Sequence, residues 1–214
     1  MKALIVQGGW DGHSPRAFAD RYAGMLRDEG FEVEIASSLD AFLDTDLLGA
    51  ELSLIVPVWT MGAISPAQLQ GLLDAVAGGV GLAGFHGGMG DAFRDATEYQ
   101  WMVGGQFVAH PDGIKDYDVT IVDHASPITH GLGDFRVTSE QYYMHVDPSN
   151  HVLATTTFHP AAASWAEGVV MPVAWTRRWG QGSVFYCSIG HAVEELEVPE
   201  VGELHRRGML WAAR

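Results

Sequence analysis

The most informative residues form the turn Gly-Phe-His-Gly-Gly at positions 84–88. An apolar run over residues 80–85 leads into this turn, and an acidic, helix-compatible segment starts at Asp91. A strand, a sharp turn with small residues two positions either side of its apex, and a following helix make the pattern of a nucleophile elbow. In hydrolases and amidotransferases the apex is Ser or Cys, whereas here it is His86. The sequence therefore predicts metal binding or acid/base chemistry at this turn, and no nucleophile.

Further histidines and one glutamate stand near the ends of other predicted elements. His110 precedes a proline, which holds it extended, and His191 follows a strand and a glycine. Imidazole and carboxylate are the usual ligands of zinc and similar divalent ions, so His86, His110 and His191 are candidate metal ligands. Their spacing is dispersed and lacks an H-E-x-x-H pattern, and each is also compatible with a structural role. Glu140 and His145 are candidates for an acid/base pair, and either one is a candidate base.

Two residues beyond predicted strands are candidates for binding substrate. Ligands of doubly wound sheets bind beyond the carboxyl ends of the strands, where His13 and Trp59 are expected. Tryptophan is a common stacking platform for sugar rings. No G-x-G-x-x-G or Walker pattern follows the glycines at positions 8–9, so no nucleotide cofactor is expected. Cys187 lies in a predicted buried strand, where a thiol is an inert apolar filler, which argues against covalent catalysis.

Composition limits the classes of partner. The 214 residues fit one domain, residues 1–214, and carry a net charge of −15 that disfavours nucleic acid and anionic membrane surfaces. The single cysteine excludes an internal disulfide and fits a reducing cytoplasm. The first apolar run is too short for a signal peptide or a membrane span. A small-molecule partner is therefore expected, and the oligomeric state is left open.

The elements that must position these residues alternate between strand and helix in the first half of the chain. Ser-Pro pairs at residues 14–15 and 65–66 predict two helix starts. Such alternation predicts an α/β fold, with a mostly parallel sheet covered by helices on both faces. Strands are expected over the short apolar or alternating runs at residues 3–6, 31–36, 52–58, 80–85, 117–122 and 152–158. A hairpin of residues 172–177 and 183–187 and a helix over residues 199–213 are expected to close the chain.

Several short motifs together resemble the ThuA-like, or trehalose-utilisation, family, and the resemblance runs over nearly the whole chain. They are Gly-Phe-His-Gly-Gly around His86, Tyr99 with Gly104-Gly105, Phe107-x-x-His110-Pro111, Glu140-x-Tyr142, Pro172-x-Ala-Trp175, residues 182–191 (Gly-x-Val-Phe-Tyr-x-Ser-Ile-Gly-His) and Met209-Leu-Trp211. The resemblance implies a flavodoxin-like, class I glutamine amidotransferase-like fold without the amidotransferase cysteine. It also implies a role in sugar catabolism, on disaccharide-derived or 3-keto sugars.

Two functional hypotheses follow. The first is a cytoplasmic enzyme that polarises the carbonyl of a keto-sugar, by a divalent metal or a histidine-rich pocket, while a base removes a neighbouring proton. Isomerisation, elimination or hydrolysis would complete the reaction. The second is a non-catalytic sugar-binding or regulatory subunit, in which Trp101 or Phe85 fills the space in front of His86. A glutamine amidotransferase is excluded because residue 86 is not cysteine.

Overall fold

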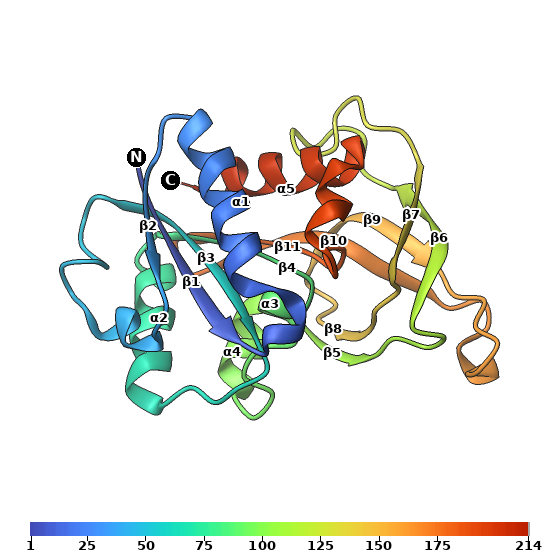
Figure 1. Ribbon diagram of the computed structural model, residues 1–214, viewed down its shortest axis with the longest axis horizontal. Coiled ribbons are helices and arrows are strands. Elements are labelled where there is room, and N and C mark those ends of the chain that lie inside the picture. Colours follow the sequence, from blue (N-terminus) through green and yellow to red (C-terminus); the bar gives the residue numbers. More distant parts are fainter. Residues whose placement is uncertain (214) are drawn as a thin grey trace.

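A nine-stranded mixed sheet organises the protein in a computed structural model that describes residues 1–213 (Figure 1). Its strand order is β2-β1-β3-β4-β11-β10-β9-β6-β7. The first five strands in this order are mutually parallel, and the pairs from β11 to β7 are antiparallel. The parallel strands are β1 (Lys2–Gly9), β2 (Glu32–Ala36), β3 (Leu52–Thr60), β4 (Gly81–Phe85) and β11 (Gly182–Cys187). The others are β10 (Val170–Trp179), β9 (His151–Thr157), β6 (Ile114–Ile121) and β7 (Phe135–Glu140).

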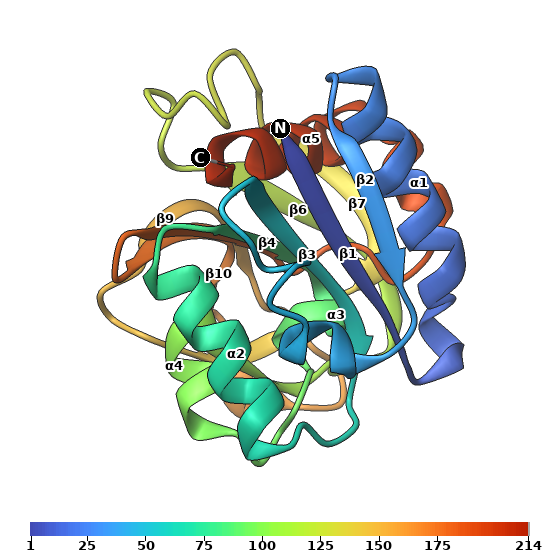
Figure 2. The same cartoon turned by 90° about the vertical axis from the view of Figure 1, so that its left-hand side faces the viewer.

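Helices cover both faces of the parallel part, which confirms the predicted α/β class (Figure 2). One face packs against α1 (Pro15–Asp28) and α5 (Pro199–Ala212). The other packs against α2 (Pro66–Ala77), α3 (His86–Gly90) and α4 (Thr97–Val103). Central β3 is almost wholly buried because both of its faces are covered, whereas β6 alternates between buried and exposed residues.

The predicted strands and the closing hairpin are confirmed, with shifts of a few residues at their ends. The hairpin pairs β10 with β11 and turns at Gly180 and Gln181. At the start of α2, Ser65 makes the expected cap: its hydroxyl accepts from the Gln68 amide, and the Gln68 side chain accepts from the Ser65 amide. Ser14 does not cap α1 with its side chain, because its backbone is left-handed, with φ of 46°. Pro15 nevertheless begins that helix, as predicted.

The elbow is present, but the helix that follows it begins earlier than predicted. Helix α3 starts at His86 itself and ends at Gly90, so the prediction of a helix from Asp91 is wrong. His86 has a φ of 47°, a left-handed conformation that is rare for residues with a side chain. A Cβ atom on Gly84 would come within 2.4 Å of the Met89 side chain. The small residues are therefore required by the tightness of this turn.

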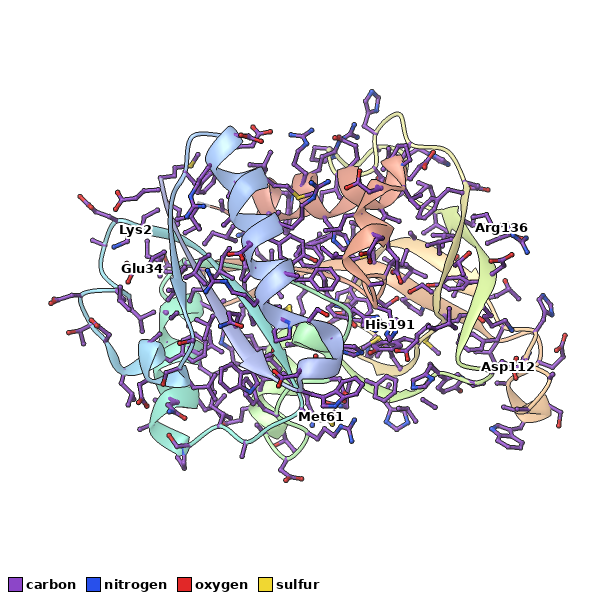
Figure 3. The ribbon with its side chains drawn as sticks, in the orientation of Figure 1. Lys2, Glu34, Met61, Asp112, Arg136 and His191 are labelled. Carbon is purple, nitrogen blue, oxygen red and sulfur yellow. The ribbon has the colours of Figure 1, made fainter. Side chains whose placement is uncertain are left out.

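The carboxyl ends of the parallel strands meet at one edge of the sheet. In Figure 3, Lys2 marks the amino end of β1 and Met61 follows the carboxyl end of β3. His191 lies towards the carboxyl ends of the strands. A second sheet of two short antiparallel strands, β5 (Gly105–Ala109) and β8 (Tyr143–Val146), had not been predicted. Strand β7, which ends at Glu140, had also not been predicted.

Candidate metal and acid/base site

Three histidines and one glutamate converge at this edge from four distant parts of the chain. Glu140 Oε2 lies 3.2 Å from His86 Nε2, 3.2 Å from His191 Nδ1 and 3.9 Å from His13 Nε2. These four ligand atoms all lie within 4.8 Å of one another. His13, His86 and His191 follow β1, β4 and β11, and Glu140 ends β7, so the cluster exists only once the sheet has formed.

His86 is held in one orientation from three sides. Its Nδ1 lies 2.8 Å from the Ser188 carbonyl oxygen, which can only accept, so Nδ1 carries a hydrogen and donates it. The Tyr142 ring stacks on the imidazole at a centroid distance of 3.9 Å. In a neutral ring, Nε2 then presents a lone pair to the Glu140 carboxylate. Two electron-rich atoms this close require a proton or a cation between them.

His13 approaches His86 from the short helix η1 (Asp11–His13), after β1. Its Nδ1 shares a hydrogen bond of 2.9 Å with Thr60 Oγ1 at the end of β3. A Cβ atom on Gly87 would lie 2.7 Å from the His13 ring, so the elbow glycine makes room for this histidine. Burial, followed by the nearby charges of His86 and His191, lowers the pKa of His13 to about 3. At neutral pH, His13 is therefore an uncharged imidazole with a lone pair.

His191 comes from the loop after β11. Gly190, with a φ of 130°, lets the chain pass close to the elbow: its substitution by a residue with a Cβ would place that atom 3.5 Å from His86 Cβ. The His191 ring lies edge-on to His13 at a centroid distance of 5.2 Å. Its buried Nδ1 has no hydrogen-bond partner, although Glu140 lies 3.2 Å away. This nitrogen is therefore available to a ligand.

Glu140 supplies the negative charge of the cluster. Burial acts to raise its pKa, but the hydrogen bond with His86 and the electrostatic effect of the neighbouring His86, His191 and His110 outweigh burial and lower the pKa to about 2. The carboxylate is thus ionised at neutral pH. His110 Nε2 lies 3.6 Å from the other oxygen, Oε1, and its side chain is 41% exposed. His110 therefore stands at the open side of the cluster, on the opposite oxygen from the other three histidines.

The donor set fits a zinc-like ion. Zinc binds imidazole nitrogen at about 2.0–2.1 Å, which places the ligand atoms of a tetrahedral site roughly 3.3 Å apart. Two of the separations from Glu140 Oε2 are 3.2 Å, and the third, to His13, is 3.9 Å. The Ser188 carbonyl accepts from the far nitrogen of His86, as carbonyls do behind metal-bound histidines. This buried group could hold a metal.

Aromatic and charged side chains continue from the cluster along one wall. Tyr142 contacts Phe107 at a centroid distance of 4.4 Å, and the Arg94 guanidinium lies 5.8 Å from the Phe107 centroid. Buried Asp91 holds Arg94 through two hydrogen bonds of 2.7 and 2.8 Å. On the other side, Trp10 is 49% exposed and lies edge-on to His13.

Besides His110, two predicted site residues lie outside the cluster. His145 is exposed on β8, opposite Gln106, and within residues 1–213 no ion pair or hydrogen bond joins it to Glu140. Trp59 is partly buried beside Gly8 and Gly62, where an added Cβ would come within 2.5 and 2.7 Å of its ring. The glycines thus enclose the indole, and its ring packs against the apolar core.

The environment of Cys187 agrees with the prediction that this thiol is not a nucleophile. The thiol is fully buried, and burial raises its pKa to about 12. Ser188 uses its carbonyl to hold His86, and Ser139 donates to Glu195.

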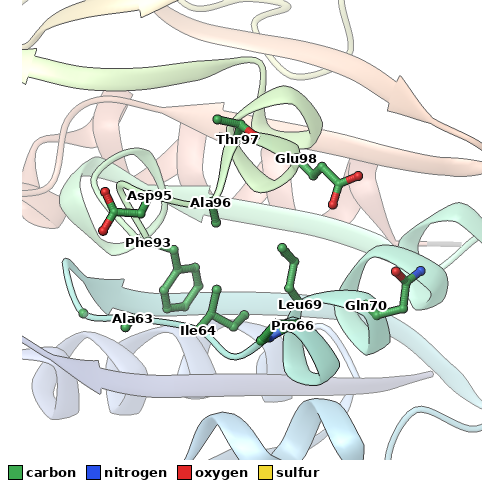
Figure 4. Close-up of a pocket in the computed structure, with 11 residues that line it drawn as sticks. Ala63, Ile64, Pro66, Leu69, Gln70, Phe93, Asp95, Ala96, Thr97 and Glu98 are labelled. Atoms are coloured by element: carbon green, nitrogen blue, oxygen red, sulfur yellow. The ribbon is translucent and has the colours of Figure 1, made fainter.

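One sizeable cavity lies apart from the cluster. It measures about 560 Å³ and lies between the starts of α2 and α4, where Ile64, Leu69 and Phe93 form part of its wall (Figure 4). The backbone bridge between Met61 and Ala92 runs beside it. Convergent polar groups, rather than volume, distinguish the candidate site from this cavity.

Several residues of the site were missed from the sequence. Thr60 is the last residue of β3 and Trp10 directly follows β1, so the topology could have indicated them. Tyr142 and Arg94 carry no spacing signal, because only the tertiary structure brings them beside His86 and Phe107.

Fold and site together define a class of protein: a flavodoxin-like α/β protein with a glutamine amidotransferase-like elbow that presents histidine. The model of the ThuA family, described as trehalose utilisation, matches residues 2–212. The chain therefore belongs to the ThuA family. None of the helices formed by residues 1–213 is long and apolar enough to cross a membrane.

Solved structures share the fold at low sequence identity. A ThuA-like protein from Parabacteroides merdae is 18% identical with a TM-score of 0.78, over 99% of this chain and 89% of that one. A ThuA-like protein from Bacteroides uniformis is also 18% identical, with a TM-score of 0.79, over 99% of this chain and 91% of that one. A cytoplasmic protein from Salmonella typhimurium is 14% identical with a TM-score of 0.69, over the whole of both chains. No curated protein matches.

Proposed function

We propose that this protein is an enzyme of sugar metabolism that moves a proton beside the carbonyl group of a keto-sugar or disaccharide-derived substrate. The observation that carries the proposal is the convergence of three imidazole nitrogens on one ionised carboxylate oxygen. Such a set costs free energy to bury, because its charges lose water, and it is typical of a functional site. The family description, trehalose utilisation, supports sugar as the substrate class.

A zinc or similar divalent ion would be held by His13, His86, Glu140 and His191. Such an ion, when bound, supplies positive charge that polarises a carbonyl oxygen. The lowered pKa of Glu140 suits an anionic ligand better than a base, because a carboxylate with a pKa of about 2 binds protons weakly. The set differs from the one predicted from the sequence, since His13 and Glu140 join it and His110 stands outside it.

The remaining residues of the site would bind, orient and protonate the substrate. His110 has the most open imidazole beside Glu140, and we assign to its Nε2 the transfer of the proton. Trp10, exposed beside His13, is positioned to stack on a sugar ring, and we assign it the role expected of Trp59. Arg94, fixed by Asp91, would donate hydrogen bonds to oxygens at the far end of the substrate.

The packing around the elbow favours an enzyme over a filled, non-catalytic scaffold. Phe85 points into the core, where it stacks on His205 at 4.0 Å. Trp101 is 61% exposed and contacts Trp179. Neither side chain covers His86, as the scaffold hypothesis requires, and the ring that stacks on His86 is that of Tyr142.

The cytoplasm is the proposed location, supported by the single buried cysteine and by the fold shared with a cytoplasmic protein from Salmonella typhimurium. The proposed partner is a small sugar, with no nucleic acid or membrane surface, because the net charge is −15.

Deuterium incorporation tests the proposed reaction. Keto-sugars, including 3-keto-glucosides, are incubated in D2O with zinc-loaded protein, and NMR follows the hydrogens beside the carbonyl. The wild-type protein should exchange one of them, and His110→Gln should reduce the rate at least about tenfold. The exposed His124→Gln is the matched control. Absence of exchange above the protein-free rate across these sugars would overturn the assigned proton transfer.

A further inference from the structure

Another buried carboxylate, that of Glu195, lies behind the site. Glu195 belongs to the short helix η4 (Val193–Glu197) and is only 8% exposed. Glu195 is not one of the four candidate metal ligands, which are His13, His86, Glu140 and His191. A buried carboxylate that loses its water without full compensation is costly, so its contacts should show what it does.

Glu195 accepts four hydrogen bonds. Its Oε2 accepts from the Ser139 hydroxyl at 2.9 Å and from the amides of Gly190 and His191, each at 3.1 Å. Its Oε1 accepts from the Ala192 amide, also at 3.1 Å. Only this last bond is the usual contact between the third residue of a helix and its cap. The other three hydrogen bonds are not part of this helix cap.

The partners of Glu195 are the immediate neighbours of two members of the cluster. The three amides belong to the loop that carries His191, and Ser139 directly precedes Glu140 at the end of β7. Successive side chains of a strand point to opposite faces, so Ser139 is held from behind while Glu140 faces the histidines. One carboxylate thus ties together the two backbones whose side chains meet at 3.2 Å.

We infer that Glu195 is a positioning residue, which sets the separation between His191 and Glu140 and thereby the affinity of the site for a divalent ion. This inference rests on the proposed metal site. Glutamine at residue 195 keeps the size of the side chain but has a single acceptor oxygen. Its NH2 group would face at least one of the four donors, so the His191 loop or β7 must move.

Zinc titration and amide hydrogen exchange of Glu195→Gln test the inference. We expect the Kd for Zn²⁺ to rise at least about tenfold, as is usual when support behind a metal ligand is lost. The amides of residues 190–192 should also exchange faster. Glu194→Gln is the matched control, because it makes the same change on an exposed neighbour in the same helix, and both readouts should stay at wild-type values.

Ser139→Ala supplies a milder variant should Glu195→Gln fail to fold. It removes the link between Glu195 and β7, together with the hydrogen bond between Ser139 and Tyr117, so Zn²⁺ affinity should fall while the amides of residues 190–192 remain protected. Wild-type affinity and exchange in Glu195→Gln, or equal losses in Glu194→Gln, would overturn the inference. If the wild-type protein binds no Zn²⁺, the proposed metal site fails, and hydrogen exchange alone then decides whether Glu195 holds the loop.

Discussion

His86 Nε2 and Glu140 Oε2 lie 3.2 Å apart, although 54 residues separate them in the chain. The opposite nitrogen of His86 donates to the Ser188 carbonyl, so the nitrogen that faces Glu140 needs either a second proton or a cation. This relationship connects the unusual apex of the elbow with the charge of the site.

The first prediction concerns the ligands of the proposed metal. Purified wild-type protein should contain close to one equivalent of a divalent ion, and His191→Ala should lower Zn²⁺ affinity at least about a hundredfold, because a ligand is lost. His145→Ala should have no effect, since His145 is exposed and lies outside the cluster. Elemental analysis and calorimetric titration provide the measurements. Equal affinities for the two variants would show that the cluster is not the metal site.

The second prediction concerns the elbow. His86→Ala and His86→Asn should both lose Zn²⁺ binding, but the alanine variant should be less stable by about 1 kcal/mol. The reason is that asparagine tolerates the left-handed conformation and alanine does not. Chemical denaturation of the metal-free proteins measures this difference. If the two variants were equally stable, residue 86 would not carry the strain that its φ of 47° indicates.

The third prediction concerns stability in acid. Burial lowers the pKa of His205 to about 3, and His205 is fully buried against Phe85. The unfolded chain therefore binds a proton that the folded protein does not, between pH 3 and the ordinary histidine value of 6.5. The free energy of unfolding should fall as pH drops through this window, by up to about 1.4 kcal/mol per pH unit for this residue.

His205→Phe should flatten this dependence, because phenylalanine keeps the stacking on Phe85 and cannot be protonated. The measurement is urea denaturation of metal-free protein at several pH values between 4 and 7, wild type and variant side by side. His130→Phe, in a surface turn, should leave the wild-type slope unchanged. An identical slope in His205→Phe and wild type would refute the role of His205.

The fourth prediction concerns substrate binding. Trp10→Ala should raise KM for the keto-sugar several-fold, with little change in Zn²⁺ affinity, because its indole is exposed beside His13 and holds no ligand atom. Trp165→Ala, at the most exposed tryptophan of the described residues, is the matched control. Trp59→Ala should instead lower the melting temperature, because the surrounding glycines have no side chains that could fill the space left by the indole.

Local patterns sufficed for most of the fold. Apolar runs, the capping sequence at Ser65 and the alternation of strands with helices each depend on neighbouring residues, so they can be detected without tertiary information. The family resemblance, now confirmed by the match over residues 2–212, indicated the class of fold, but β5, β7 and β8 were not predicted. The start of α3 could not be predicted, because the left-handed backbone of His86 is imposed by packing around the elbow.

The sequence by itself determined that a histidine occupies the apex of a tight elbow and that other histidines and a glutamate stand near strand ends. Only the tertiary structure decided which of them meet. His13, His86 and His191 share one oxygen of Glu140, while His110 faces the other oxygen and His145 lies apart. The physical reason is that the order of strands in the sheet, and not their order in the chain, determines which strand ends are neighbours.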